Sequence, residues 1–199
     1  MEKTAKPMQA RSQKTKEKIL GAALAMYAKK GYHSTTVDEI AAEAGVSTGI
    51  AYRYFRNKKD ILLSAISYAA ENIRTIADTD KLTVPDDIAD MGCYLEAVLR
   101  SFEEIHVRFH DIHEELEGLQ HTDKDVRDLY NSISSKMMDG VIAKLDTMLN
   151  EPANIREKAY LAVNIMEQYC HMKMNSDAVQ FDFDVLRQKT IEAVICIFS

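Results

Sequence analysis

A glycine between two short helix-forming segments constrains this chain more than any other feature of its sequence. Residues 32–59 read YHSTTVDEIAAEAGVSTGIAYRYFRNKK. Thr35 or Thr36 can cap a helix whose first turn carries two acidic residues, which the helix dipole favours. Gly45 supplies a turn, and Ser47 can cap a second helix. The segment therefore predicts a helix-turn-helix, in which the second helix enters a DNA groove.

The second helix, over about 48–55, begins with TGIA and offers little to a hydrophobic core at its start. Small residues there let the backbone approach base edges and phosphates closely. Tyr52 can contact a thymine methyl or a phosphate, and Arg53 can contact guanine or the backbone. Phe55 and part of Tyr54 are expected to fill the core between three helices.

Amphipathic helices precede and follow this motif. One is expected to start near residues 12–15 and to end at Gly31, with apolar residues at three- and four-residue spacing: Ile19, Ala22, Ala23, Met26 and Tyr27. Another covers about 58–77, with Asn57 as its cap. Lys58 lies in its first turn, where the dipole disfavours a cation, so we expect an anionic group opposite it.

The net charge of −6 is divided unevenly along the chain. Residues 1–64 contain 12 Lys and Arg against 6 Asp and Glu, a net charge of +6, whereas the remaining residues contain 13 against 25, a net charge of −12. A basic N-terminal part and an acidic remainder suit a protein that faces nucleic acid with one end only. The alternative is an N-terminal face that is solvated and binds nothing.

Residues 13–73 resemble the DNA-binding domain of TetR-family transcriptional regulators, above all in the pattern TTVxxIAxxAGVSxGxxYxYFxNK at 35–58. The resemblance implies an all-α fold. It consists of an N-terminal three-helix DNA-binding domain over 13–73, with the helix-turn-helix at 36–55, and a helical-bundle domain over 80–199. The second domain would bind an effector and dimerise. The family acts on palindromic operators as homodimers, without enzymatic activity or a cofactor.

The same resemblance implies DNA contacts at eight positions. Thr36, Tyr54 and Lys58 match positions that contact phosphates. Bases or flanking phosphates would be contacted by the remaining positions: Ser47, Thr48, Gly49, Tyr52 and Arg53. Thr48 and Arg53 depart from the commonest residues of the family, so the operator sequence does not follow from the resemblance. We expect Arg53 to change base preference.

The C-terminal part predicts five further helices, over about 86–101, 103–120, 125–149, 154–175 and 182–198. The helix at 154–175 is apolar on two sides, which predicts burial on two sides. Pairing the last two helices with those of a second copy would form a four-helix dimer interface. The alternative is an ordinary core within one chain.

Aromatic residues and methionines of these helices are candidates for an effector pocket, because methionine repacks easily around a ligand. The same residues would suit a plain core equally well. The candidates are Tyr94, Phe102, Phe109, Tyr130, Met137, Met166 and Tyr169.

Three histidines form the least ordinary pattern of the C-terminal part. His106, His110 and His113 are spaced by four and three residues, and Glu117 follows after four more. Side chains at this spacing share one helix face and can approach a common transition-metal ion. A half-exposed stripe without a ligand is the alternative.

No apolar run reaches the roughly 20 residues that a membrane helix needs, and the N-terminal segment has no signal-peptide core. We therefore expect a cytoplasmic protein, with Cys93, Cys170 and Cys196 as reduced thiols in or near the core.

No motif indicates catalysis, since a phosphate-binding glycine loop and a nucleophile elbow are both missing. The favoured hypothesis is a repressor that binds a palindromic operator as a homodimer and is released by a small-molecule effector. Two alternatives remain: a DNA-bound structural or protein-partner factor without such a switch, and a metal-binding helical carrier.

Overall fold

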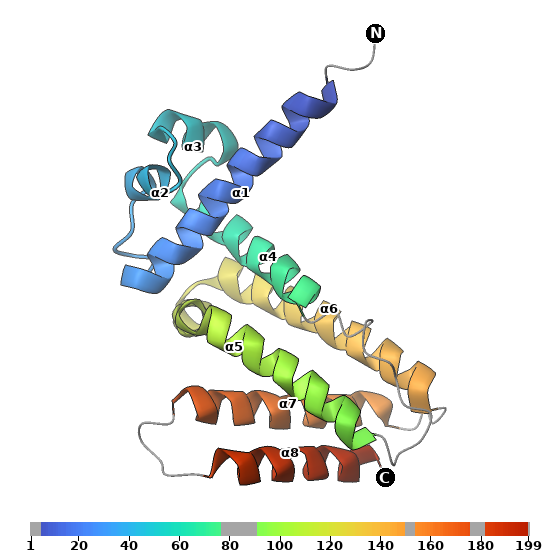
Figure 1. The fold of residues 1–199 in the computed structure, drawn as a ribbon. Helices are drawn as coiled ribbons and strands as arrows, with labels where there is room; N and C mark the ends of the chain where they lie inside the picture. Colours follow the sequence, from blue (N-terminus) through green and yellow to red (C-terminus); the bar gives the residue numbers. More distant parts are fainter. Residues whose placement is uncertain (1–4, 77–90, 150–153, 176–181, 199) are drawn as a thin grey trace. The chain divides into compact units, whose positions relative to one another are not determined.

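The computed structural model of the chain describes residues 5–76, 91–149, 154–175 and 182–198 (Figure 1). Every regular element in this part is an α-helix, which confirms the predicted all-α class. The helices are α1 (Ala5–Lys30), α2 (Val37–Glu43), α3 (Thr48–Tyr54), α4 (Lys58–Ile76), α5 (Met91–Thr122), α6 (Lys124–Leu149), α7 (Ile155–Met174) and α8 (Phe183–Phe198). None of the described helices combines the length and the apolar character that crossing a membrane requires.

Two compact units divide the chain. The first comprises Met1–Asn72 and Asp111–Tyr130, and the second comprises Ile73–His110 and Asn131–Ser199. The helix-turn-helix lies in the first unit. The stretch Asp111–Tyr130 belongs to the predicted C-terminal domain by sequence, yet it groups with the helix-turn-helix.

Two helices differ from the predicted boundaries. α1 begins at Ala5, well before residues 12–15. Pro7 is compatible with this start, because it lies in the first turn, where its missing N–H would have no helical partner anyway. α5 is one helix of 32 residues where two were predicted. The Ser101 hydroxyl, at the predicted end of the first of these two helices, donates to the Ala97 carbonyl at 3.1 Å, and the helix continues past it to Thr122.

The core of the first unit is built from apolar residues of several helices. Ile19, Ala23 and Tyr27 of α1 and Ile40 of α2 are all buried. From α3 and the residue after it, the buried side chains are Ala51 and Phe55. The first turn of α4 and the turn that follows supply Ile61, Leu62 and Ala65.

A capping box determines where α2 begins. The Glu39 N–H donates to the Thr36 hydroxyl at 3.3 Å, and the Thr36 N–H donates to the Glu39 carboxylate at 2.8 Å. Hydrogen bonding from Lys30, followed by that from the Thr36 backbone and hydroxyl, lowers the pKa of Glu39 to about 2. Gly45 follows α2 with φ of +67°, a left-handed conformation that costs glycine little, and turns the chain toward α3.

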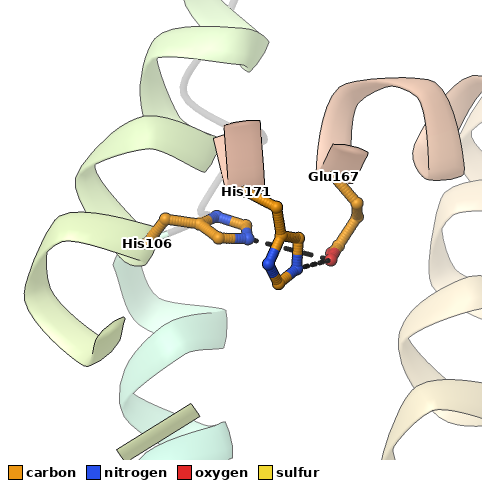
Figure 2. A group of neighbouring side chains, drawn as sticks. All are labelled: His106, Glu167 and His171. Atoms are coloured by element: carbon orange, nitrogen blue, oxygen red, sulfur yellow. Dashed lines mark ion pairs between the residues drawn. The ribbon is translucent and has the colours of Figure 1, made fainter. Parts of the chain in front are cut away.

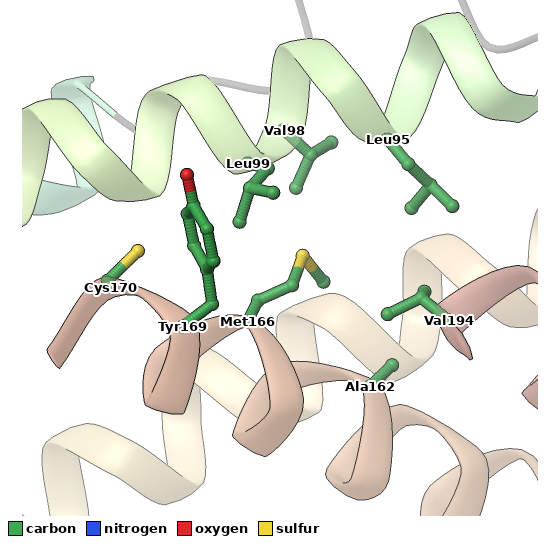
Figure 3. Close-up of a cluster of buried hydrophobic side chains, with 8 residues drawn as sticks. All are labelled: Leu95, Val98, Leu99, Ala162, Met166, Tyr169, Cys170 and Val194. Atoms are coloured by element: carbon green, nitrogen blue, oxygen red, sulfur yellow. The ribbon is translucent and has the colours of Figure 1, made fainter. Parts of the chain in front are cut away.

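The core of the second unit joins three helices (Figure 3). It packs Leu95, Val98 and Leu99 of α5 and Val194 of α8 against four residues of α7: Ala162, Met166, Tyr169 and Cys170. Cys170 is buried, but Cys93 and Cys196 are exposed, so the expectation of three thiols in or near the core is wrong for these two. Their positions lie on outward faces of α5 and α8.

Charged groups beside this core pair with one another. The Arg187 guanidinium of α8 donates to Glu96 at 2.5 Å and to Glu103. Glu103 also accepts from the Lys173 ammonium and from the Tyr169 hydroxyl, each at 2.7 Å. Burial opposes the charge of Glu103, but these hydrogen bonds outweigh it and lower the pKa of the carboxyl. The negative charges of two carboxylates on α5 are therefore neutralised by two cations, one on α7 and one on α8.

Replacing Thr36 with alanine should loosen α2, because the Glu39 N–H loses the hydroxyl that accepts its hydrogen bond. A lost cap costs about 1 kcal/mol, which corresponds to roughly fivefold faster amide exchange in the helix. Hydrogen–deuterium exchange of Val37–Glu43 in the DNA-free protein measures the effect. Thr15→Ala is the matched control, because the Thr15 hydroxyl donates to the Arg11 carbonyl at 2.9 Å within α1 and caps nothing. Equal exchange in α2 for both variants would contradict the assigned role.

Candidate nucleic-acid interface

α3 presents a polar face outward and an apolar face inward. Gly49, Tyr52 and Arg53 are exposed, and the Tyr52 side chain is 54% accessible although its ring is largely apolar. Ala51 and the following Phe55 are buried on the other side. A ring left in water on a short helix is unusual for a residue that only stabilises the fold, and this arrangement suits a helix that contacts another surface.

The hydroxyl groups predicted to contact DNA already have roles within the first unit. The Thr48 hydroxyl donates to the Asp38 carboxylate at 2.5 Å and so joins α3 to α2. Thr36 is occupied in the capping box, and the Tyr54 hydroxyl accepts from Ser12 of α1 at 3.2 Å. Ser47 occupies the N-cap position of α3, but its side chain makes no capping hydrogen bond, contrary to expectation.

Lys58, predicted to contact a phosphate, makes several contacts within the first unit. Its ammonium donates to the backbone carbonyls of Tyr32 at 3.0 Å, His33 at 3.2 Å and Thr35 at 3.0 Å, and it lies 4.4 Å from the centroid of the Tyr32 ring. An ammonium has three N–H donors, and three carbonyl oxygens use them. The partner expected opposite this cation is therefore a set of carbonyl dipoles in the loop before α2, and Lys58 stabilises that loop.

A basic stripe on α1 was missed by the sequence reasoning. Arg11, Lys14 and Lys18 are exposed and are spaced by three and four residues, so they lie on one face of the helix. Ser12, which hydrogen-bonds Tyr54, brings this part of α1 beside α3. The spacing was readable, but the helix was expected to begin only at residues 12–15.

The stretch Asp111–Tyr130 completes the first unit from far along the chain. The Tyr32 N–H donates to the Glu115 carboxylate at 2.6 Å. Lys59 pairs with Asp123 at 2.9 Å and with Asp125 at 2.6 Å, and hydrogen bonding from Asp125 and then Asp123 raises the pKa of Lys59 to about 12. These ion pairs hold the end of α5 and the start of α6 against the first turn of α4.

The predicted pocket residues differ widely in burial. Met166 and Tyr169 are 6% and 2% exposed and belong to the core of the second unit, with Tyr94 and Phe102 packed against it. Met137 is exposed on α6, and the remaining candidates are half-buried: Phe109 and Tyr130.

A hollow of about 390 Å³ lies elsewhere, on the surface of the first unit. It is open and is lined by Tyr27, Ala28, Lys29, Lys30, Gly31, Glu114 and Glu115. None of the predicted pocket residues lines it.

The histidines are arranged differently from the predicted stripe. His106 lies beside Glu167 and His171 of α7, which spacing along one helix could not reveal (Figure 2). The His113 Nε2 atom lies 3.6 Å from the Glu117 carboxylate. The side chain of His110 lies outside the described residues. Burial opposes a charge on His106, but hydrogen bonds with Cys170, Glu167 and the Phe102 carbonyl together raise its pKa to about 10.

Comparisons with known proteins agree with this architecture. The family model "Bacterial regulatory proteins, tetR family" matches residues 19–65. Two HTH-type transcriptional regulators of Bacillus subtilis, YerO and YvkB, are 45% identical over 53 residues and 32% identical over 98 residues. These segments cover 27% and 49% of this chain. The chain spans about half the length of YvkB, 52%, and 18% of that of YerO.

The fold of this chain resembles that of solved regulators beyond the helix-turn-helix as well. The transcriptional regulator FadR from Bacillus subtilis, in complex with stearoyl-CoA, matches with a TM-score of 0.68 and 21% identity over 90% of this chain and 97% of that chain. At this identity the match shows a shared fold. The helix-turn-helix with its outward α3 face, the family model and the whole-chain fold together lead to one assignment. The helix-turn-helix domain of the chain belongs to the tetR family of transcriptional regulators, which is not a family of enzymes.

Proposed function

We propose that the chain is a transcriptional repressor that binds a palindromic operator as a homodimer and is released by a small-molecule effector. The main support for this proposal is the exposed face of α3. Thr48 holds α3 to α2 through Asp38, while Tyr52 and Arg53 extend into solvent. A fixed helix with exposed donors is what base recognition in a major groove requires.

The proposed contacts divide into two groups. Thr48, Gly49, Tyr52 and Arg53 face the groove, while Thr36, Ser47 and Tyr54 approach the flanking phosphates. The exposed stripe of Arg11, Lys14 and Lys18 on α1 adds cations that neutralise phosphate charge. Lys58 is not among these contacts, since its ammonium is used within the fold.

Tyr52→Ala and Arg53→Ala should each weaken operator binding by about fivefold or more, because each removes a groove contact and leaves the buried face of α3 intact. The operator is first obtained by selecting a randomised duplex library with the wild-type protein. Fluorescence anisotropy at fixed salt then gives the dissociation constants. Arg127→Ala is the control, because Arg127 is exposed in the same unit on α6 and outside the helix-turn-helix. Wild-type affinity in both α3 variants would rule out this recognition surface.

Apolar side chains on the last two helices support dimerisation through them. Tyr160 and Leu161 of α7 and Val185 of α8 are exposed, with Leu161 55% accessible. α7 and α8 also pack closely on each other within the second unit. Exposed large apolar residues on paired helices favour burial against a second copy of the same pair.

Leu161→Glu should convert the dimer to a monomer at micromolar concentration, because a carboxylate in an apolar interface loses its hydration. Size-exclusion chromatography with light scattering reports the mass. Val107→Glu is the matched control, because Val107 of α5 is 63% exposed and lies outside α7 and α8. A monomeric wild type, or dissociation caused only by Val107→Glu, would place the interface elsewhere.

The effector is proposed to be an apolar small molecule bound in the second unit. Half-buried Tyr94 and Phe102 border the core on α5, and Met166 can repack beneath them. The chain shares its fold with the FadR that was solved with stearoyl-CoA, which makes a long-chain acyl-CoA the first effector to test.

Stearoyl-CoA should raise the melting temperature of the DNA-free protein and weaken binding to the selected operator. A ligand that binds only the native state stabilises it by about 2.7 kcal/mol at 100 times its Kd. Differential scanning calorimetry and anisotropy provide the two measurements, with coenzyme A alone as the control for binding through the nucleotide. Unchanged melting and unchanged operator affinity would exclude acyl-CoA as the effector.

A further inference from the structure

Two imidazoles and one carboxylate converge between α5 and α7 of the second unit (Figure 2). The Nε2 atom of His106 lies 3.8 Å from the Glu167 Oε2 atom, and the Nε2 atom of His171 lies 3.9 Å from the same oxygen. The ligand atoms of all three residues lie within 4.8 Å of one another. His171 and Glu167 are four residues apart, so one turn of α7 presents both toward α5.

These separations are close to those around a bound metal ion. Ligand atoms about 2.0 to 2.1 Å from a tetrahedral zinc ion are about 3.3 Å from one another. The two nitrogen-to-oxygen distances exceed that value by roughly half an ångström, which small side-chain rotations can close. The imidazole rings meet edge to face, with centroids 5.2 Å apart, so one ring does not lie flat against the other.

A backbone carbonyl fixes the orientation of the His106 ring. Its Nδ1 atom lies 2.8 Å from the Phe102 carbonyl, a distance at which Nδ1–H donates to the carbonyl, and its Nε2 atom faces Glu167. A metal ion bound here would displace the Nε2 proton. A backbone acceptor on the far nitrogen is the usual support of a metal-binding histidine, because it sets the tautomer and the ring plane. The His106 side chain is only 11% exposed, so its ring has little freedom to turn away.

The neighbouring carboxylate, that of Glu103, already accepts several hydrogen bonds. Glu103, one turn before His106 on α5, accepts from Arg187, Lys173 and Tyr169. Glu167 lies between two imidazoles, 3.8 Å from the His106 Nε2 atom and 3.9 Å from the His171 Nε2 atom. Two nitrogen donors and one oxygen donor, partly open to solvent, form a set that suits zinc, cobalt and nickel ions better than magnesium or calcium.

We propose that His106, Glu167 and His171 bind one divalent transition-metal ion of the zinc class, with a remaining coordination position open to water or to an exogenous ligand. The site ties α5 to α7 and lies beside Cys170 and Tyr169 of the buried core. It shares only His106 with the stripe expected from the sequence.

The test uses the full-length protein without a histidine tag, stripped with a chelator. Titration with Co²⁺ should produce visible d–d absorption that saturates at one ion per chain, and isothermal titration with Zn²⁺ should give the same stoichiometry. Glu167→Gln and His171→Gln should each weaken binding by about tenfold or more. Both side chains are partly exposed, so neither variant removes a core residue.

His121→Gln is the matched control, because His121 is exposed at the end of α5, well beyond His106 on the same helix, and belongs to the first unit. Its affinity should equal that of the wild type. Circular dichroism checks that each variant is folded before titration. Absence of saturable Co²⁺ and Zn²⁺ binding by the wild type would overturn the proposal, as would unchanged affinity in folded Glu167→Gln and His171→Gln. No DNA is needed, so the result is independent of operator binding.

Discussion

The Lys58 ammonium, bound to three backbone carbonyls between Tyr32 and Thr35, holds the loop from which the helix-turn-helix starts. The Thr35 hydroxyl, which is buried, donates to the Gly31 carbonyl at 2.8 Å and closes the same loop from the other side. Carbonyls at the end of a helix have no helical partner, and an unpaired polar group away from water is costly. The cation therefore holds the loop that leads into the capping box of α2, and the Thr48–Asp38 hydrogen bond joins α3 to that helix.

This loop is also where the end of α5 reaches the first unit. Glu115 accepts the Tyr32 N–H, next to the carbonyl that Lys58 binds, and Lys59 pairs with Asp123 and Asp125. Two adjacent lysines at the start of α4 thus have different partners. Lys58 binds the loop before α2, and Lys59 pairs with the stretch Asp111–Tyr130. A displacement of that stretch would act on the same few hydrogen bonds that position α3, which is the physical route by which the proposed effector would change the proposed operator binding.

Local signals predicted the helix-turn-helix well, because caps, the Gly45 turn and small residues each act over a few positions. The outward orientation of Tyr52 and Arg53 followed from the same signals. The role of Lys58 did not follow from local signals, because the three carbonyls that it binds converge only after the chain folds. The partners of His106 were likewise unreadable: helical periodicity indicates neighbours on one helix, whereas Glu167 and His171 arrive from α7. Two helices were predicted over about 86–101 and 103–120, whereas the structure has one continuous helix, α5, through this region.

The division of α3 into a buried side and an exposed side has a consequence for how the family can diversify. Ala51 and Phe55 supply the anchoring of this helix in the core, whereas Gly49, Tyr52 and Arg53 contribute little to it. Substitutions at exposed positions usually change stability by less than about 0.5 kcal/mol. With α3 as the proposed recognition helix, new operator preferences can arise by mutation at the outer positions without first unfolding the protein. Duplicated copies of such a gene could then read different promoters while keeping one scaffold.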